Sequence, residues 1–76
     1  MRKSVTFEVV GRQRIACDGC EQRIEKLLKS VPGVDKARAS MRSQRIEVLF
    51  DGTAVNANAL AARIGTAGYQ TKLVSY

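Results

Sequence analysis

The chain contains two cysteines, Cys17 and Cys20, which stand three residues apart in the segment Cys17-Asp18-Gly19-Cys20. An ionised thiol is both a soft metal ligand and a strong nucleophile. A helical pattern begins at this segment, and residues three apart on a helix face the same side. The pair can therefore bind a metal ion, cycle between dithiol and disulfide, or simply pack. Metal binding is the role that we favour.

The predicted helix start suits ionised sulfur. Its unpaired N–H groups carry a partial positive charge, which stabilises a thiolate relative to a thiol. Gly19 allows backbone or a partner to approach closely. Asp18 is well placed at the positive end of the helix, although its charge opposes thiolate formation.

The ligand set narrows the choice of metal. Two thiolates suit Cu(I), and Hg(II) is chemically similar. Zn(II) prefers four ligands, but the chain has no histidine, and Asp18 would add only one oxygen. We therefore expect an open site, from which an incoming thiolate can take the ion by ligand exchange. Zn(II) and Cd(II) remain alternatives.

The length and charge of the chain limit the number of domains and the kind of partner. The 76 residues predict one domain, 1–76, and 13 Lys and Arg against seven Asp and Glu give a net charge of +6, which favours an acidic partner. No apolar run approaches the ~18 residues of a membrane span, so we expect no membrane insertion. A strand pattern rather than a signal sequence follows the basic N-terminus, so we expect a cytoplasmic protein. In a reducing cytosol, two close cysteines favour a ligand or redox pair over a structural disulfide.

Six secondary-structure elements are predicted from the hydrophobic pattern. Alternation predicts strands over residues 5–9, 34–41, 46–50 and 69–74. Helical spacing predicts one helix from Cys20 to Val31, ended by Pro32-Gly33, and a second capped by Asn56. With right-handed crossovers, this order predicts an α+β ferredoxin-like βαββαβ sandwich, in which two helices cover one face of a four-stranded antiparallel sheet.

This topology places residues 12–20, 41–45 and 67–69 at one end of the sheet. Tyr69 is then expected as a ring at the edge of the core. Met41 is expected to fill the core rather than donate sulfur. Basic side chains gathered at this end would offset the charge of a metal–dithiolate centre and guide docking; the candidates are Arg12, Arg14, Arg42 and Arg45, with Arg23 and Lys26 on the first helix extending the surface.

The chain resembles the heavy-metal-associated domain, a family of small copper chaperones, metal-binding domains of copper- and zinc-exporting P-type ATPases, and mercuric-ion-binding proteins. The resemblance rests on three segments, namely Ile15-Ala16-Cys17-Asp18-Gly19-Cys20, Val31-Pro32-Gly33-Val34 and Ala67-Gly68-Tyr69. It implies soft-metal binding through Cys17 and Cys20 and a Cu(I) chaperone that serves a P-type ATPase. It also implies a second role for Tyr69, as a ring that screens the site, beside that of a ring at the edge of the core. Ile15 stands where family members usually carry Met, and Gly11 is separated from it by Arg12-Gln13-Arg14.

Other functions fit the residues less well. The same element order serves RNA-recognition domains, but the segment from Arg45 to Phe50 lacks the glycines and the pattern of aromatic residues of their sequence motif, so no nucleic-acid partner is expected. A thiol oxidoreductase would need a supporting thioredoxin-like fold. We therefore expect a metal-binding protein rather than an enzyme, with a zinc, cadmium or mercuric-ion module, or an isolated exporter domain, as the alternative.

Overall fold

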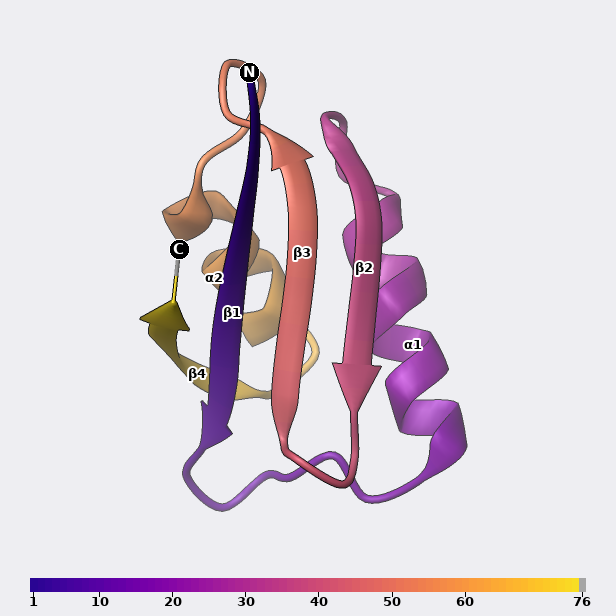
Figure 1. Cartoon of the computed structure of the whole chain (residues 1–76). Coiled ribbons are helices and arrows are strands. Elements are labelled where there is room, and N and C mark those ends of the chain that lie inside the picture. The colour runs from indigo at the N-terminus through magenta and orange to yellow at the C-terminus, as the bar shows by residue number, and fades with distance from the viewer. Residues whose placement is uncertain (76) are drawn as a thin grey trace.

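Four strands and two helices make up the computed structural model, which describes residues 1–75. The elements are β1 (Arg2–Val10), α1 (Asp18–Lys29), β2 (Val34–Ser40), β3 (Arg45–Asp51), α2 (Ala57–Gly65) and β4 (Gln70–Ser75). The strands form one sheet in the order β2-β3-β1-β4, and each neighbouring pair is antiparallel. Both helices lie behind this sheet in Figure 1. The predicted ferredoxin-like fold is confirmed.

The core lies between the sheet and the helices. Alternate residues of the two central strands point into it and pair across the sheet, with Val5 opposite Val48 and Phe7 opposite Ile46. The helices contribute the fully buried side chains Ile24, Leu28, Leu60 and Ile64. Burying each such side chain contributes about 1.5–3 kcal/mol, so this layer fixes the register of the strands that carry the loops.

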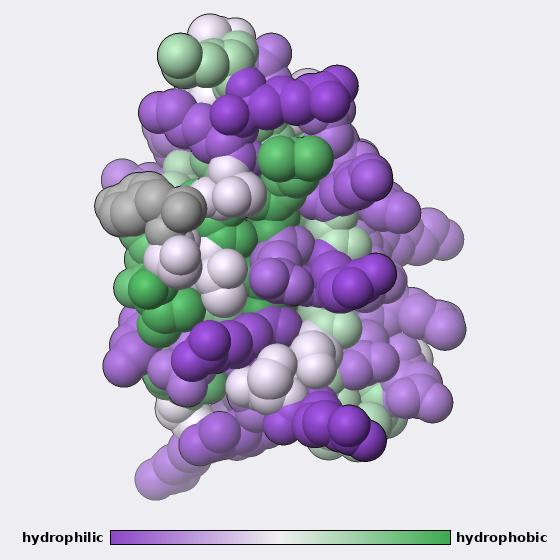
Figure 2. Space-filling model, viewed as in Figure 1, coloured by the Kyte–Doolittle hydropathy of each residue, from purple (hydrophilic) through white to green (hydrophobic). Residues whose placement is uncertain are grey.

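The sheet face that the helices leave uncovered is polar over much of its area (Figure 2). The three aromatic rings of residues 1–75, Phe7, Phe50 and Tyr69, are buried instead, at 2%, 2% and 6% exposure. Within the described chain, neither helix combines the length and apolar character needed to cross a bilayer.

Local signals at the helix ends and turns are confirmed. The Asn56 side chain accepts a hydrogen bond from the Ala59 N–H at 2.8 Å, which caps α2. Gly68 adopts the left-handed backbone that is common just after a helix ends, with φ at 95°. β1 begins earlier than its apolar pattern indicates, because the polar residues 2–4 also pair with β3.

The expectation that Met41 fills the core is wrong. β2 ends at Ser40, and Met41 begins the turn that leads to β3. Its side chain is 38% exposed. The inward-facing alternation of Ala37 and Ala39 therefore does not continue to Met41, because the chain leaves the sheet after Ser40.

Asp51 organises the end of the sheet opposite the cysteines. The backbone N–H and the hydroxyl of Thr53 donate to its carboxylate at 2.9 and 2.7 Å, and the Met1 amino group donates at 3.0 Å. These hydrogen bonds, led by that of the Thr53 backbone, lower the pKa of Asp51 from 3.8 to about 2. The folded state therefore favours the ionised carboxylate.

This arrangement predicts pH-dependent stability. The contribution of ionised Asp51 is complete above the unfolded pKa, near 3.8, and is lost as the pH falls towards the folded pKa of about 2. Asp51→Asn is expected to lower the melting temperature at pH 7, and the difference from the wild type should shrink between pH 4 and pH 2. Thermal unfolding followed by circular dichroism across this range tests it, and a difference that does not change with pH would contradict it.

Candidate metal centre

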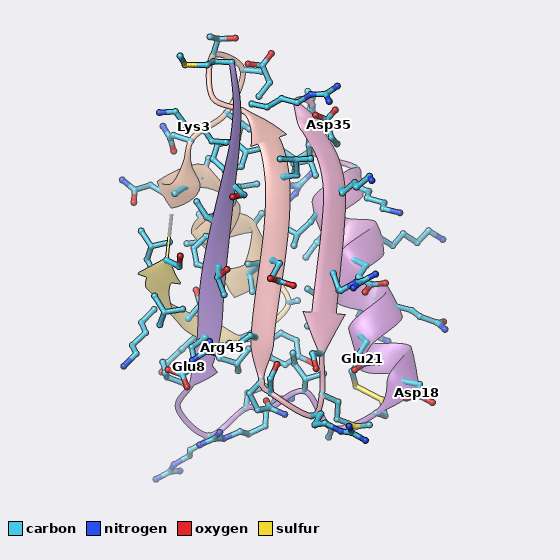
Figure 3. The ribbon with its side chains drawn as sticks, in the orientation of Figure 1. Lys3, Glu8, Asp18, Glu21, Asp35 and Arg45 are labelled. Carbon is cyan, nitrogen blue, oxygen red and sulfur yellow. A yellow bond between two sulfur atoms is a disulfide. The ribbon has the colours of Figure 1, made fainter. Side chains whose placement is uncertain are left out.

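The two cysteines meet at the start of α1. Cys17 is the N-cap in extended conformation, and Cys20 lies in the first turn. The Cys17 Sγ accepts a hydrogen bond from the Cys20 N–H at 3.1 Å. The two sulfurs are joined as a disulfide, with the Cα atoms 5.1 Å apart (Figure 3). The prediction that both sulfurs reach one small volume is confirmed, and reduction of the bond would leave two thiols there.

The pair is open on one side and anchored on the other. Cys17 is exposed, whereas Cys20 is half-buried and packs against the core. Asp18 is exposed and points away from the body of the molecule in Figure 3. At Gly19, a side chain would meet only the Cys17 Sγ, at 3.9 Å. The surface around the pair is therefore accessible to a partner, as expected for Gly19.

Ile15 anchors the loop that leads to Cys17. Its side chain is only 1% exposed and belongs to the core cluster. The expected apolar packing of this position is therefore confirmed. The neighbouring loop residues from Gly11 to Arg14 are all exposed, so Ile15 is the point at which the loop is attached to the core.

Gln44 holds the Ile15 backbone from the turn between β2 and β3. Its side-chain amide accepts from the Ile15 N–H at 2.9 Å and donates to the Ile15 carbonyl at 2.8 Å and to the Met41 carbonyl at 2.7 Å. The Gln44 carbonyl in turn accepts from the Val9 N–H of β1 at 2.8 Å. Gln44 was not among the predicted site residues, because a polar residue in a turn belongs to no hydrophobic pattern.

Two carboxylates of α1 bind backbone N–H groups at the end of β2 and at the start of the turn that follows it. Glu25 accepts from the Ala39 N–H at 3.0 Å, and Glu21 accepts from the Met41 N–H. Figure 3 shows Glu21 between the first turn of α1 and the end of β2. These bonds satisfy N–H groups that an edge strand otherwise leaves unpaired, and they attach the cysteine-bearing turn to the sheet. Their i, i+4 spacing places the two acids on one face of the helix, but it does not indicate their partners.

The three segments expected at one end of the sheet do lie together. Gln44 joins residues 12–20 to residues 41–45 through Ile15. Glu21, directly after the first segment, accepts from the Met41 N–H. A shallow hollow of about 360 Å³ is lined by both Gly11 and Gly68, so the α2–β4 connection borders the same loop. Tyr69 is a core residue, 6% exposed. Its predicted role as a screen over the metal stays a prediction.

Most of the predicted docking residues surround the cysteine end. The candidates are all exposed, and within residues 1–75 none lies within 4.0 Å of an acidic group; they are Arg12, Arg14, Arg23, Lys26, Arg42 and Arg45. Arg45 pairs across the sheet with Glu8. Lys26 is less well placed, because six helical residues put it about 9 Å along α1 from Cys20.

The described residues offer few further ligands. Among residues 1–75, the structure brings together no group of three or more His, Cys, Asp or Glu side chains suited to a metal. The donor set at this end of the sheet is therefore the sulfur pair, which fits a soft ion that accepts two thiolates.

Known proteins with similar sequences bind or transport copper, according to their names. Copper-transporting ATPase 2 of Rhizobium meliloti is 39% identical over 69 residues, which cover 90% of this chain and 8% of that protein. The copper chaperone CopZ of Enterococcus hirae is 29% identical over 68 residues, which cover 90% of this chain and 94% of the chaperone. The chain thus spans less than a tenth of the ATPase and nearly the whole length of the chaperone.

Solved structures and a family model agree with the fold. A copper-binding domain from HMA7, a P-type ATPase, has a TM-score of 0.87 and 28% identity, and covers 99% of this chain and 96% of its own. Oxidised MerP from Ralstonia metallidurans has a TM-score of 0.84 and 25% identity, and covers 96% and 97%. The family model matches residues 12–70, which include both cysteines and Tyr69. The chain therefore belongs to the heavy-metal-associated domain family.

Proposed function

We propose that this domain binds Cu(I) through Cys17 and Cys20 in their reduced form and passes it to a metal-binding domain of a copper-exporting P-type ATPase. The observation that carries the proposal is the convergence of two sulfurs at an exposed helix N-terminus. The site is a binding and transfer site, and the proposal assigns no catalysed reaction to it.

The local geometry supports thiolate chemistry. The Cys20 N–H already points at the Cys17 sulfur, at 3.1 Å, and the partial positive charge of the helix start favours negative charge on it. The exposed guanidinium groups of the surrounding loops oppose the net negative charge that Cu(I) and two thiolates carry together. Both features stabilise the dithiolate without adding a ligand to the ion.

Transfer follows from the openness of the pair. A thiolate of the partner can bind the ion on its exposed side, giving a three-sulfur intermediate, and one protein thiolate then leaves. A second exchange completes the transfer, and the oxidation state of the metal is unchanged throughout. The disulfide form cannot take part, because metal binding needs thiolates and the sulfurs of a disulfide are bonded to each other instead. We therefore place the protein in a reducing compartment such as the cytoplasm.

Two alternatives keep the cysteine pair as the binding site: the chain is a domain of a metal exporter, or it binds an ion other than Cu(I). The chain matches the metal-binding part of copper ATPases as well as a free chaperone, so it can serve as an exporter domain. The similarity to MerP supports Hg(II) as another ion that two thiolates can bind. Zn(II) and Cd(II) fit less well, because the described residues supply no four-ligand set.

A nucleic-acid function is less well supported. RNA-recognition sheets stack bases on exposed aromatic rings, whereas Phe7, Phe50 and Tyr69 are buried on the helix side or in the core. The net charge of +6 is accounted for by docking on an acidic protein surface.

The cysteines are predicted to be essential for Cu(I) binding. Under anaerobic, reducing conditions the wild type should compete with a coloured Cu(I) chelator, and the double variant Cys17→Ser/Cys20→Ser should lose this competition, with an affinity at least about 100-fold weaker because a hydroxyl is a poor ligand for a soft ion. Asp18→Asn is the matched control from the same turn and should compete like the wild type. Unchanged competition by the double serine variant would end the proposal.

The basic surface is predicted to accelerate transfer to an acidic partner. Arg12→Glu/Arg42→Glu should slow Cu(I) transfer to the metal-binding domain of a copper-exporting P-type ATPase by about tenfold at low salt, because charge steering raises encounter rates. Added salt should reduce the difference. Stopped-flow measurement of the transfer tests this.

The control for that experiment is Lys3→Glu/Lys36→Glu, which makes the same change in net charge away from the cysteines. Lys3 lies at the opposite end of the sheet (Figure 3). Equal slowing by both double variants would show that net charge, and not a docking surface at the cysteine end, determines the rate.

A further inference from the structure

We propose that Gln44 is a positioning residue for the metal: its side-chain amide holds the backbone of Ile15, and so places Cys17, before the ion arrives. This inference rests on the proposed function and adds to it a residue that makes no contact with the ion. The evidence is a combination of an unusual backbone conformation, three side-chain hydrogen bonds and the position of Ile15.

The backbone of Gln44 is in the left-handed region. Its φ is 57°, and it is the one non-glycine residue with positive φ in the described part of the chain. Glycine adopts this conformation freely, and Asn and Asp are the side chains found there most often. A glutamine at this position has no conformational advantage over them. The reason for Gln44 must therefore be sought in its side chain.

The Gln44 side chain uses both ends of its amide. The oxygen accepts from the Ile15 N–H, and the nitrogen donates to the carbonyls of Ile15 and Met41. Binding both backbone groups of one residue fixes its position and its orientation. The partner residue is 29 positions away in sequence, so these bonds join the metal loop to a separate turn.

Ile15 transmits this restraint to the metal ligands. It stands two residues before Cys17 and is the first buried residue after the exposed segment from Gly11 to Arg14. The loop has no regular structure of its own between β1 and α1. Burial of the Ile15 side chain fixes one side of this residue, and the Gln44 amide fixes its backbone. In this structure the S–S bond itself joins the two sulfurs. Once that bond is reduced, the restraint on Ile15 would keep Cys17 beside Cys20 without help from the metal.

A preordered site binds more tightly, because the ion does not have to order the loop. Loss of the amide should therefore weaken Cu(I) binding. The expected effect is about tenfold in Kd, which corresponds to roughly one or two neutral hydrogen bonds. Dissociation should become faster to a similar extent.

Two substitutions distinguish the effect of the Gln44 side-chain amide from that of its left-handed backbone conformation. Gln44→Gly keeps the left-handed turn and removes the side chain. Gln44→Asn keeps both the turn and an amide, but it is one methylene shorter and should not reach Ile15. If the role of Gln44 depends on a side chain long enough to reach Ile15, the two variants should behave alike. Anaerobic chelator competition should then give a Kd for Cu(I) about tenfold higher than in the wild type.

Hydrogen exchange of the metal-free protein tests the restraint on Ile15 separately from the affinity for Cu(I). Hydrogen exchange by NMR on the reduced apo protein should show the Ile15 amide exchanging at least about tenfold faster in both variants, whereas Ala59, whose N–H is held by Asn56, should exchange as in the wild type. A general loss of stability would accelerate both amides and overturn the assignment of a local role.

The outcomes distinguish this inference from the proposed function. Wild-type affinity in both Gln44 variants, with the wild type binding Cu(I), would overturn the role of Gln44 and leave the function intact. Wild-type affinity in Gln44→Asn alone would also overturn it, because the reach of the side chain would not matter. A wild type that binds no Cu(I) would overturn the proposed function and this inference with it.

Discussion

The chemistry of this domain depends on how the backbone presents Cys17 at the start of α1. The N-cap geometry directs the Cys20 N–H at the Cys17 sulfur, so the positive end of the helix lies where the proposed dithiolate would carry its negative charge. Burial of Ile15 attaches the preceding loop to the core. A pair of sulfurs on an unanchored loop would have to be ordered by the metal itself, at a cost in affinity.

The rest of the fold supports that end of the molecule. The sheet positions the β2–β3 turn beside the metal loop, and Gln44 connects the two. Glu21 and Glu25 fasten α1 to the edge of β2, so the helix that carries Cys20 is fixed against the sheet. The opposite end is built around Asp51 and its hydrogen bonds to Thr53 and Met1. The hydrogen-bonded Asp51 carboxylate and the proposed metal site thus lie at opposite ends of the same sheet.

The sequence predicts the architecture well because the core follows simple periodic patterns. Val5, Phe7 and Val9 alternate, and Ile24 and Leu28 share a helix face, so element order and topology follow. Patterns of this kind end where the chain leaves the sheet, which explains the error at Met41. The cysteine pair was also predictable, since its residue type and spacing carry the chemistry.

The residues that support the pair could not be predicted in the same way. Gln44 acts through hydrogen bonds to a loop 29 residues away, and its importance depends on a left-handed turn that no hydrophobic pattern indicates. Glu21 and Glu25 looked like ordinary solvent-facing acids of a helix. Their partners are backbone N–H groups, which every segment possesses, so only the folded arrangement identifies them.

X-ray absorption at the copper edge tests the central claim most directly. The reduced protein, loaded anaerobically with one equivalent of Cu(I) as a monomer, should give a spectrum of copper coordinated by sulfur, with two sulfur neighbours and no nitrogen or oxygen in the nearest shell. A nearest shell dominated by nitrogen or oxygen would contradict the account, because the ion would then be bound away from Cys17 and Cys20.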